Sequence, residues 1–86
     1  MTTKKQWCEG IVESYAKENG FEGKPVPEDE VYYSTTLGIA MEHLGLLTDP
    51  EIRKYIKSRV GTISIDESDG DVTVKTAREY LASLPD

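Results

Sequence analysis

Apolar residues near the start of the chain recur at helical spacing and predict a first helix that begins at Lys4. One broad stripe of this helix carries the residues Trp7, Cys8, Ile11, Val12, Tyr15 and Ala16. Thr3 and Gln6 have the spacing of a capping box, in which each side chain bonds to the backbone N–H of the other residue. Gly20 is suited to the left-handed conformation that ends a helix, with Phe21 packing back as in a Schellman motif.

The stretch from Pro27 to Gly45 predicts a central helix that is apolar on two adjoining faces. One face carries Tyr33, Leu37, Ala40, Met41 and Leu44, and the other carries Tyr32, Ile39, His43 and Leu46. Pro27 suits the first helical position, where its missing N–H costs nothing. Gly38 costs about 1 kcal/mol relative to alanine inside a helix. It therefore indicates either the close approach of another helix or a tolerated weakness.

A third helix is predicted to begin at Pro50, because Asp49 is a favourable N-cap and proline a favourable first residue. Its core-facing residues are expected to be Ile52, Tyr55, Ile56 and Val60. Gly61 ends the helix. The third helix and the two helices before it are predicted to form a three-helix core.

Beyond Gly61 the hydrophobic period changes from helical spacing to two, which is typical of strands with one buried face. Ile63 and Ile65 alternate with polar residues, and Val72 and Val74 do the same. This pattern predicts a two-stranded β-hairpin with a four-residue loop from Glu67 to Gly70.

Thr76 and Glu79 have capping-box spacing and predict a short C-terminal helix that ends before Pro85. The predicted fold class is therefore mainly α (α+β): a three-helix core, then a two-stranded β-hairpin and a short C-terminal helix. Residues 1–86 are expected to form a single small domain, since a chain of 86 residues supports one modest core.

The charge of the chain restricts its partners. Sixteen acidic residues against ten basic ones give a net charge of −6, which argues against general attraction to nucleic acid or to an anionic membrane. The single cysteine, Cys8, cannot form an internal disulfide, and no apolar run approaches the roughly 18 residues that span a bilayer. The polar start MTTKKQ does not have the pattern of a signal peptide. We therefore expect a cytoplasmic protein without membrane partners.

The charges are unevenly distributed along the chain. Residues 25–51 carry six acidic groups and no Lys or Arg, whereas residues 52–65 carry four basic groups and no acid. Two acidic segments are predicted to meet a basic protein partner, and their residues are Glu28, Asp29, Glu30, Tyr32, Asp66, Glu67, Asp69 and Asp71. The basic third helix has a simpler interpretation as a solvated face paired with neighbouring carboxylates.

The order of helices, turn, basic helix and hairpin resembles the winged helix-turn-helix family of DNA-binding domains. The resemblance covers Thr36 to Val74 and depends on AMEHLGL, residues 40–46, and on residues 52–56. This sequence departs from the family in a turn one residue longer and in an acidic wing tip. The resemblance implies that the third helix enters the major groove and assigns to DNA the residues Arg53, Lys54, Lys57 and Arg59.

We find no sequence pattern for catalysis or for a cofactor. His43 and Cys8 are the only histidine and thiol, and no residue is placed to orient them as a nucleophilic pair. The sequence DESDGD at 66–71 resembles a calcium loop, but its glycine is one position early and no closing glutamate follows. Weak calcium binding there is left open, with an Asp- and Gly-rich hairpin tip as the simpler interpretation.

Two functions therefore remain. The first is a small non-enzymatic protein-binding module, an inhibitor that covers a basic or nucleic-acid-binding surface of its partner. Its size and charge are similar to those of phage-encoded inhibitors of host defence systems. The alternative is a winged helix-turn-helix transcriptional regulator that binds DNA. Either protein could be a monomer or a homodimer.

Overall fold

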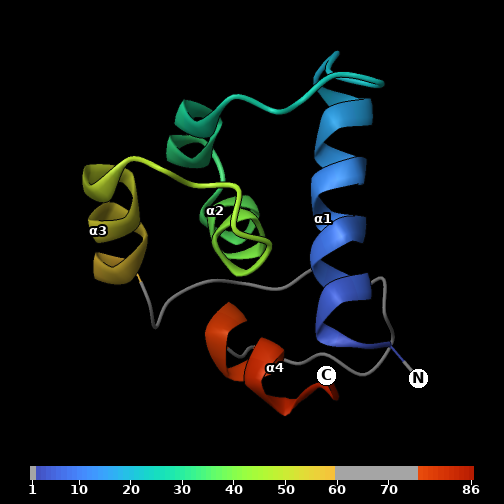
Figure 1. Cartoon of the computed structure of the whole chain (residues 1–86), viewed down its shortest axis with the longest axis vertical. Coiled ribbons are helices and arrows are strands. Elements are labelled where there is room, and N and C mark those ends of the chain that lie inside the picture. The colour runs from blue at the N-terminus through green and yellow to red at the C-terminus, as the bar shows by residue number, and fades with distance from the viewer. Residues whose placement is uncertain (1, 60–75) are drawn as a thin grey trace.

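The computed structural model describes residues 2–59 and 76–86, in which all regular secondary structure is helical. The elements in chain order are α1 (Lys4–Glu18), the 3-10 helix η1 (Glu28–Tyr32), α2 (Thr35–His43), α3 (Pro50–Ser58) and α4 (Ala77–Ser83). Helix α2 is central and contacts all four of the others. Helices α1 and α3 lie on opposite sides of it, and α4 lies below α1 and α2 (Figure 1).

Both ends of α1 form as the sequence predicts. The Gln6 N–H donates to Thr3 Oγ1 at 3.1 Å and the Thr3 N–H donates to Gln6 Oε1 at 2.9 Å, which completes the capping box. At the other end Gly20 has a φ of 83°, and the Phe21 N–H donates to the Ala16 carbonyl at 2.7 Å. This bond is the Schellman closure, because it satisfies a carbonyl that the helix leaves unpaired.

The prediction of one continuous central helix from Pro27 is wrong, because the chain breaks at Ser34. The backbone of Ser34 is extended (φ −150°, ψ 108°), and its hydroxyl caps α2 by accepting the Leu37 N–H. The preceding residues form η1 instead. This break buries Val31 and leaves Tyr33 exposed, although the helical pattern had assigned Tyr33 to the core.

The core is a single cluster built around α2. Its buried members are Trp7, Cys8, Val31, Leu37, Ile39, Ala40, Met41, Leu47, Ile52, Ile56, Ala77 and Leu81. Gly38 is buried within this cluster, and a Cβ at that position would lie 2.8 Å from Ile56 Cδ1 and 3.0 Å from Val31 Cβ. The predicted close approach at Gly38 is confirmed, because only glycine leaves room there for α3 and η1.

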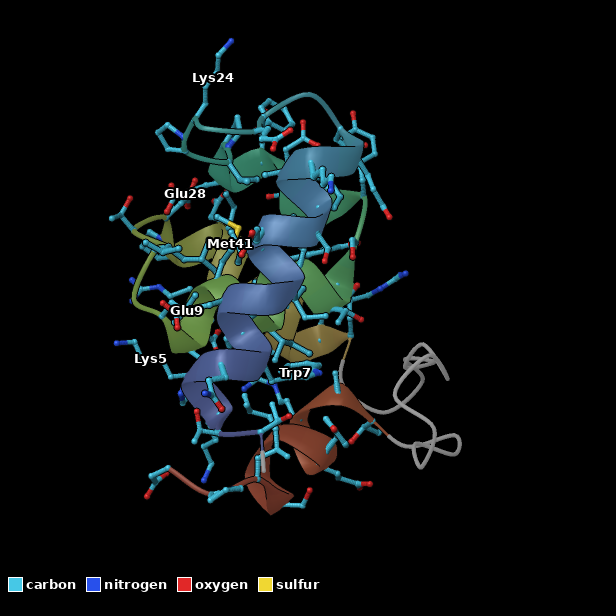
Figure 2. All side chains as sticks on the ribbon, turned by 90° about the vertical axis from the view of Figure 1, so that its right-hand side faces the viewer. Lys5, Trp7, Glu9, Lys24, Glu28 and Met41 are labelled. Carbon is cyan, nitrogen blue, oxygen red and sulfur yellow. The ribbon has the colours of Figure 1, made fainter. Side chains whose placement is uncertain are left out.

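Helix α4 joins the end of the chain to the start of α1. The Trp7 and Tyr80 rings meet edge to face with centroids 5.5 Å apart, and in Figure 2 Trp7 lies between α1 and α4. The Lys4 N–H donates to the Pro85 carbonyl at 2.8 Å, and Lys4 Nζ lies 2.9 Å from Asp86 Oδ1. The predicted helix starts at Asp49 and Thr76 are both confirmed by side-chain caps.

The predicted α+β class requires correction, because the described residues form four α-helices and one 3-10 helix without any β-strand. The expected two-stranded hairpin is not seen, and its segment falls within 60–75, outside the described residues. None of the helices in 2–59 and 76–86 is long and apolar enough to cross a membrane.

Candidate functional site

The acidic segment at 28–30, predicted to meet a partner, is largely used inside the molecule. The Glu28 carboxylate accepts the Thr48 N–H and, at 3.2 Å, the Thr48 hydroxyl, which ties η1 to the loop before α3. The Glu30 carboxylate accepts the Tyr15 hydroxyl, which ties η1 to α1. Asp29 is exposed. Two of the three carboxylates therefore hold η1 in place instead of facing a partner.

The hydrogen bond from Tyr15 also changes its acidity. Donation to the Glu30 carboxylate, together with burial, raises the pKa of Tyr15 to about 12. The neutral phenol is stabilised because ionisation would remove the donated proton and place a second negative charge beside the carboxylate.

Tyr32 remains available at the surface, with 48 % of the residue exposed. Its ring meets that of Tyr55 edge to face with centroids 4.7 Å apart, and the Arg59 guanidinium lies 5.6 Å from the Tyr55 centroid. The predicted site thus retains Tyr32 and Asp29 at the surface. Its other four members, Asp66, Glu67, Asp69 and Asp71, lie outside the described residues.

The basic residues of α3 are exposed, on the side of the helix away from the buried Ile52 and Ile56. Arg53, Lys54 and Lys57 form no ion pair with any other residue in the described ranges. The interpretation of these charges as partners of neighbouring carboxylates therefore gains no support from residues 2–59 and 76–86.

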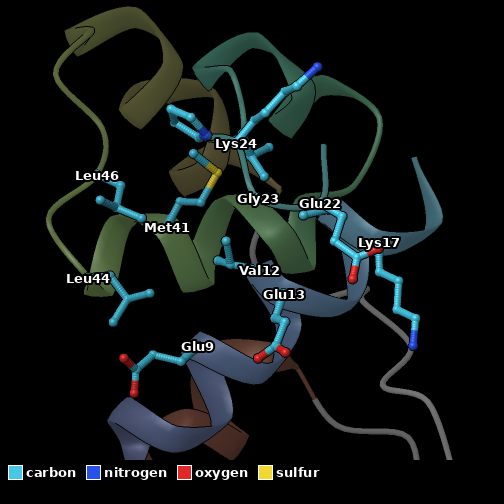
Figure 3. Close-up of a pocket in the computed structure, with 13 residues that line it drawn as sticks. Glu9, Val12, Glu13, Lys17, Glu22, Gly23, Lys24, Met41, Leu44 and Leu46 are labelled. Atoms are coloured by element: carbon cyan, nitrogen blue, oxygen red, sulfur yellow. The ribbon is translucent and has the colours of Figure 1, made fainter. Parts of the chain in front are cut away.

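A groove that the sequence analysis did not identify lies between α1, the connector before η1 and the end of α2. Its volume is about 590 Å³. The floor is apolar, and the rim is charged, as Figure 3 shows. The lining residues are Glu9, Val12, Glu13, Ala16, Lys17, Glu22, Gly23, Lys24, Pro25, Val26, Met41, Leu44 and Leu46.

Helical periodicity produces the wall that α1 contributes to this groove. Val12 and Ala16 are four residues apart and form an apolar row, and Glu9 and Glu13 form a neighbouring acidic row with the same spacing. Glu9 and Glu13 are exposed and form no ion pair with another described residue. Figure 3 shows both carboxylates on one edge of the groove.

The opposite wall depends on the turn that ends α2. Gly45 has a φ of 72°, and the Leu46 N–H donates to the Met41 carbonyl at 2.9 Å, a second Schellman closure. This turn fixes Leu46 at the mouth of the groove, where 49 % of the residue is exposed. Leu46 is one of the three large hydrophobic residues that the described ranges leave exposed.

One sequence signal for this groove was present. The neighbouring elements do not cover the whole apolar stripe of α1: Val12 is half-buried and lines the groove, whereas the half-buried Ile11 and Tyr15 do not line it. Their spacing could not distinguish a core face from an open groove, because that depends on how α1 and α2 pack.

The remaining reactive side chains do not form a catalytic arrangement. Cys8 is fully buried, and burial, with a smaller contribution from Glu9, raises the pKa of its thiol to about 11. His43 is exposed at the end of α2. No group of three or more His, Cys, Asp and Glu side chains within 2–59 and 76–86 is arranged to hold a metal ion.

The groove is therefore the feature of the described chain most suited to binding. Its volume and apolar floor are typical of sites that receive a ligand or a few side chains of a partner. Comparisons of the chain with protein-family models, with curated proteins and with solved structures found no match.

Proposed function

We propose that this chain is a non-enzymatic protein-binding module that holds a basic segment of a partner protein in the groove between α1 and α2. The observation that carries this proposal is the apolar floor bordered by Glu9 and Glu13, two exposed carboxylates without an ion pair in the described chain. A partner segment with apolar and basic side chains satisfies both features at once.

Apolar burial supplies the affinity in this proposal, and charge supplies selectivity. Covering Leu46, of which 49 % is exposed, removes apolar surface from water at about 25 cal/mol per Å². The net charge of −6 raises the rate at which a basic partner is encountered and lowers that for an acidic one.

A partner whose basic surface binds nucleic acid would lose access to that nucleic acid when the module occupies it. The module would then act as an inhibitor by steric and electrostatic competition. We place this role in the cytoplasm, because a lone cysteine gives no indication of a fold built for an oxidising compartment.

The test compares two variants with the same change in net charge. Glu9→Lys/Glu13→Lys reverses the acidic rim, whereas Glu18→Lys/Glu51→Lys reverses two exposed carboxylates that do not line the groove. Each variant and the unmodified protein are used to capture partners from the source cells, followed by mass spectrometry. The proposal predicts a basic protein that is captured by the unmodified protein and by the Glu18/Glu51 variant only. Equal capture by both variants would show that the groove is not the binding surface.

A second candidate function uses α3 to bind DNA. The specific observation in its favour is that Arg53, Lys54 and Lys57 are exposed together and unpaired within the described chain. This function predicts salt-dependent binding of duplex DNA that Arg53→Glu/Lys54→Glu/Lys57→Glu abolishes. A gel shift with that behaviour, unaffected by Glu9→Lys/Glu13→Lys, would replace the first proposal with the second.

A further inference from the structure

The shape of the groove favours one type of occupant. Its long wall runs along α1 from Glu9 to Lys17, a length of about 12 Å at roughly 1.5 Å per residue, or about two helical turns. The facing wall is the last part of α2 with Leu44 and Leu46. Residues 2–59 and 76–86 contain no sheet edge to which an extended peptide could add as a strand. A groove between two helices instead accepts a third helix.

The charges around the groove are arranged asymmetrically. Glu9 and Glu13 lie on one edge, as Figure 3 shows, and neither forms an ion pair in the described ranges, although Lys17 follows Glu13 by one helical turn. The other end of the rim mixes Lys17 and Lys24 with Glu22 and is nearly balanced. Two carboxylates four residues apart present negative charges about 6 Å from each other along the helix. Cations one turn apart on a helical partner match this spacing.

The floor of the groove has room for bulky side chains. Ala16 contributes only a methyl group, so the wall of α1 is recessed at that point. Met41 lies at the bottom of the groove as part of the buried core and gives the floor its apolar base. Leu44 is half-buried and Leu46 half-exposed, so both can gain contacts when the groove is filled.

We infer that the occupant of the groove is a basic amphipathic helix of a partner protein, about two to three turns long. Its apolar side chains at positions i, i+3 or i+4, and i+7 pack against Val12, Leu44 and Leu46, above the buried Met41. Its lysines or arginines, in the adjacent row, pair with Glu9 and Glu13. This inference rests on the proposed function, because it names the kind of segment that the module holds.

The test uses synthetic peptides of identical composition, rich in Leu and Lys and about 14 residues long, or roughly 21 Å as a helix. In the first peptide the leucines follow helical spacing, in the second they alternate with lysine as in a strand, and in the third their order is scrambled. Binding is measured by fluorescence anisotropy. The helical pattern is expected to bind at least about tenfold more tightly than either of the others, and to gain helical circular dichroism on binding.

Variants of the protein locate the peptide. We expect Leu46→Lys and Glu9→Lys/Glu13→Lys each to lower the affinity for the first peptide about tenfold. Tyr33→Lys is the matched control, because it places the same charge at a residue that is 81 % exposed and does not line the groove. In NMR spectra the methyl groups of Val12, Met41, Leu44 and Leu46 should shift, and those of Ile52 should not.

The possible outcomes separate this inference from the proposed function. Equal or tighter binding of the alternating peptide overturns the helical occupant, and the proposed function survives if Glu9→Lys/Glu13→Lys still abolishes capture of the partner. Peptide binding that Leu46→Lys leaves unchanged overturns both. Sedimentation that reveals a dimer disrupted by Leu46→Lys assigns the groove to a second copy of the chain and also overturns the inference.

Discussion

Replacing Gly38 with alanine tests the packing of α2 against α3 and η1. The new Cβ would lie 2.8 Å from Ile56 Cδ1, 2.9 Å from Ile56 Cγ1 and 3.0 Å from Val31 Cβ. Ile56 Cδ1 is the end of a flexible side chain, but Val31 Cβ is fixed to its backbone and moves only with η1. Overpacking of this kind costs about 1–3 kcal/mol, and the gain in helix propensity returns about 1 kcal/mol. We expect Gly38→Ala to lower the free energy of unfolding by up to about 2 kcal/mol.

The chain provides a matched control for this substitution. Gly10 lies in α1 with nothing within 4 Å of a new Cβ, so Gly10→Ala gains propensity without a clash and is expected to stabilise the protein by about 0.5–1 kcal/mol. Urea unfolding followed by circular dichroism at 222 nm measures both changes.

A double-mutant cycle identifies the cause of the destabilisation. Ile56→Val removes Cδ1, the nearest atom, and alone costs about 0.5–1.5 kcal/mol. In the Gly38→Ala background, Ile56→Val should cost less stability than in the unmodified protein, because removing Cδ1 relieves the clash with the new Cβ. If Gly38→Ala stabilises the protein as much as Gly10→Ala does, α3 and η1 do not approach α2 closely at Gly38.

Three further predictions concern single side chains. In the unmodified protein the folded Tyr15 keeps its proton up to about pH 12, whereas an unfolded tyrosine ionises near 10.0, so alkali favours unfolding in this interval. The free energy of unfolding should therefore fall more steeply above pH 10 than in Tyr15→Phe, and equal slopes would contradict the hydrogen bond to Glu30. Cys8, with a pKa of about 11 against an ordinary 9.0, should carry about 100-fold less thiolate at pH 8 and react with iodoacetamide far more slowly than after unfolding in urea. Ser34→Ala removes the α2 cap and should cost about 0.5–2 kcal/mol in urea unfolding, whereas Ser34→Asp should retain most of the stability.

Local signals along the chain predicted several helix ends, although the prediction that α3 continues to Gly61 is wrong, because it ends at Ser58. The capping box at Thr3, the N-cap at Asp49 and the left-handed turn at Gly20 depend on neighbours within a few residues, so the sequence contains all the atoms involved. Gly38 also indicated a tertiary contact, because glycine is unfavourable inside a helix and is retained where another element packs closely, here Ile56 of α3.

Features that depend on distant residues were not predictable in the same way. The break at Ser34 was indicated by a good N-cap residue followed by two threonines, but the apolar pattern on both sides concealed it. Glu28 and Glu30 resembled a solvated acidic patch, since nothing local shows that Thr48 and Tyr15 are their partners. The groove between α1 and α2 likewise arises only when the two helices pack.

The contact between the two ends of the chain has a practical consequence. Because the Lys4 N–H is bonded to the Pro85 carbonyl, a short peptide linker could join the ends into a ring with little change to the native backbone. Ring closure over a chain of this length would reduce the conformational freedom of the unfolded chain and stabilise the native protein by on the order of 4 kcal/mol. Neither end lines the groove, so ring closure would leave the groove open.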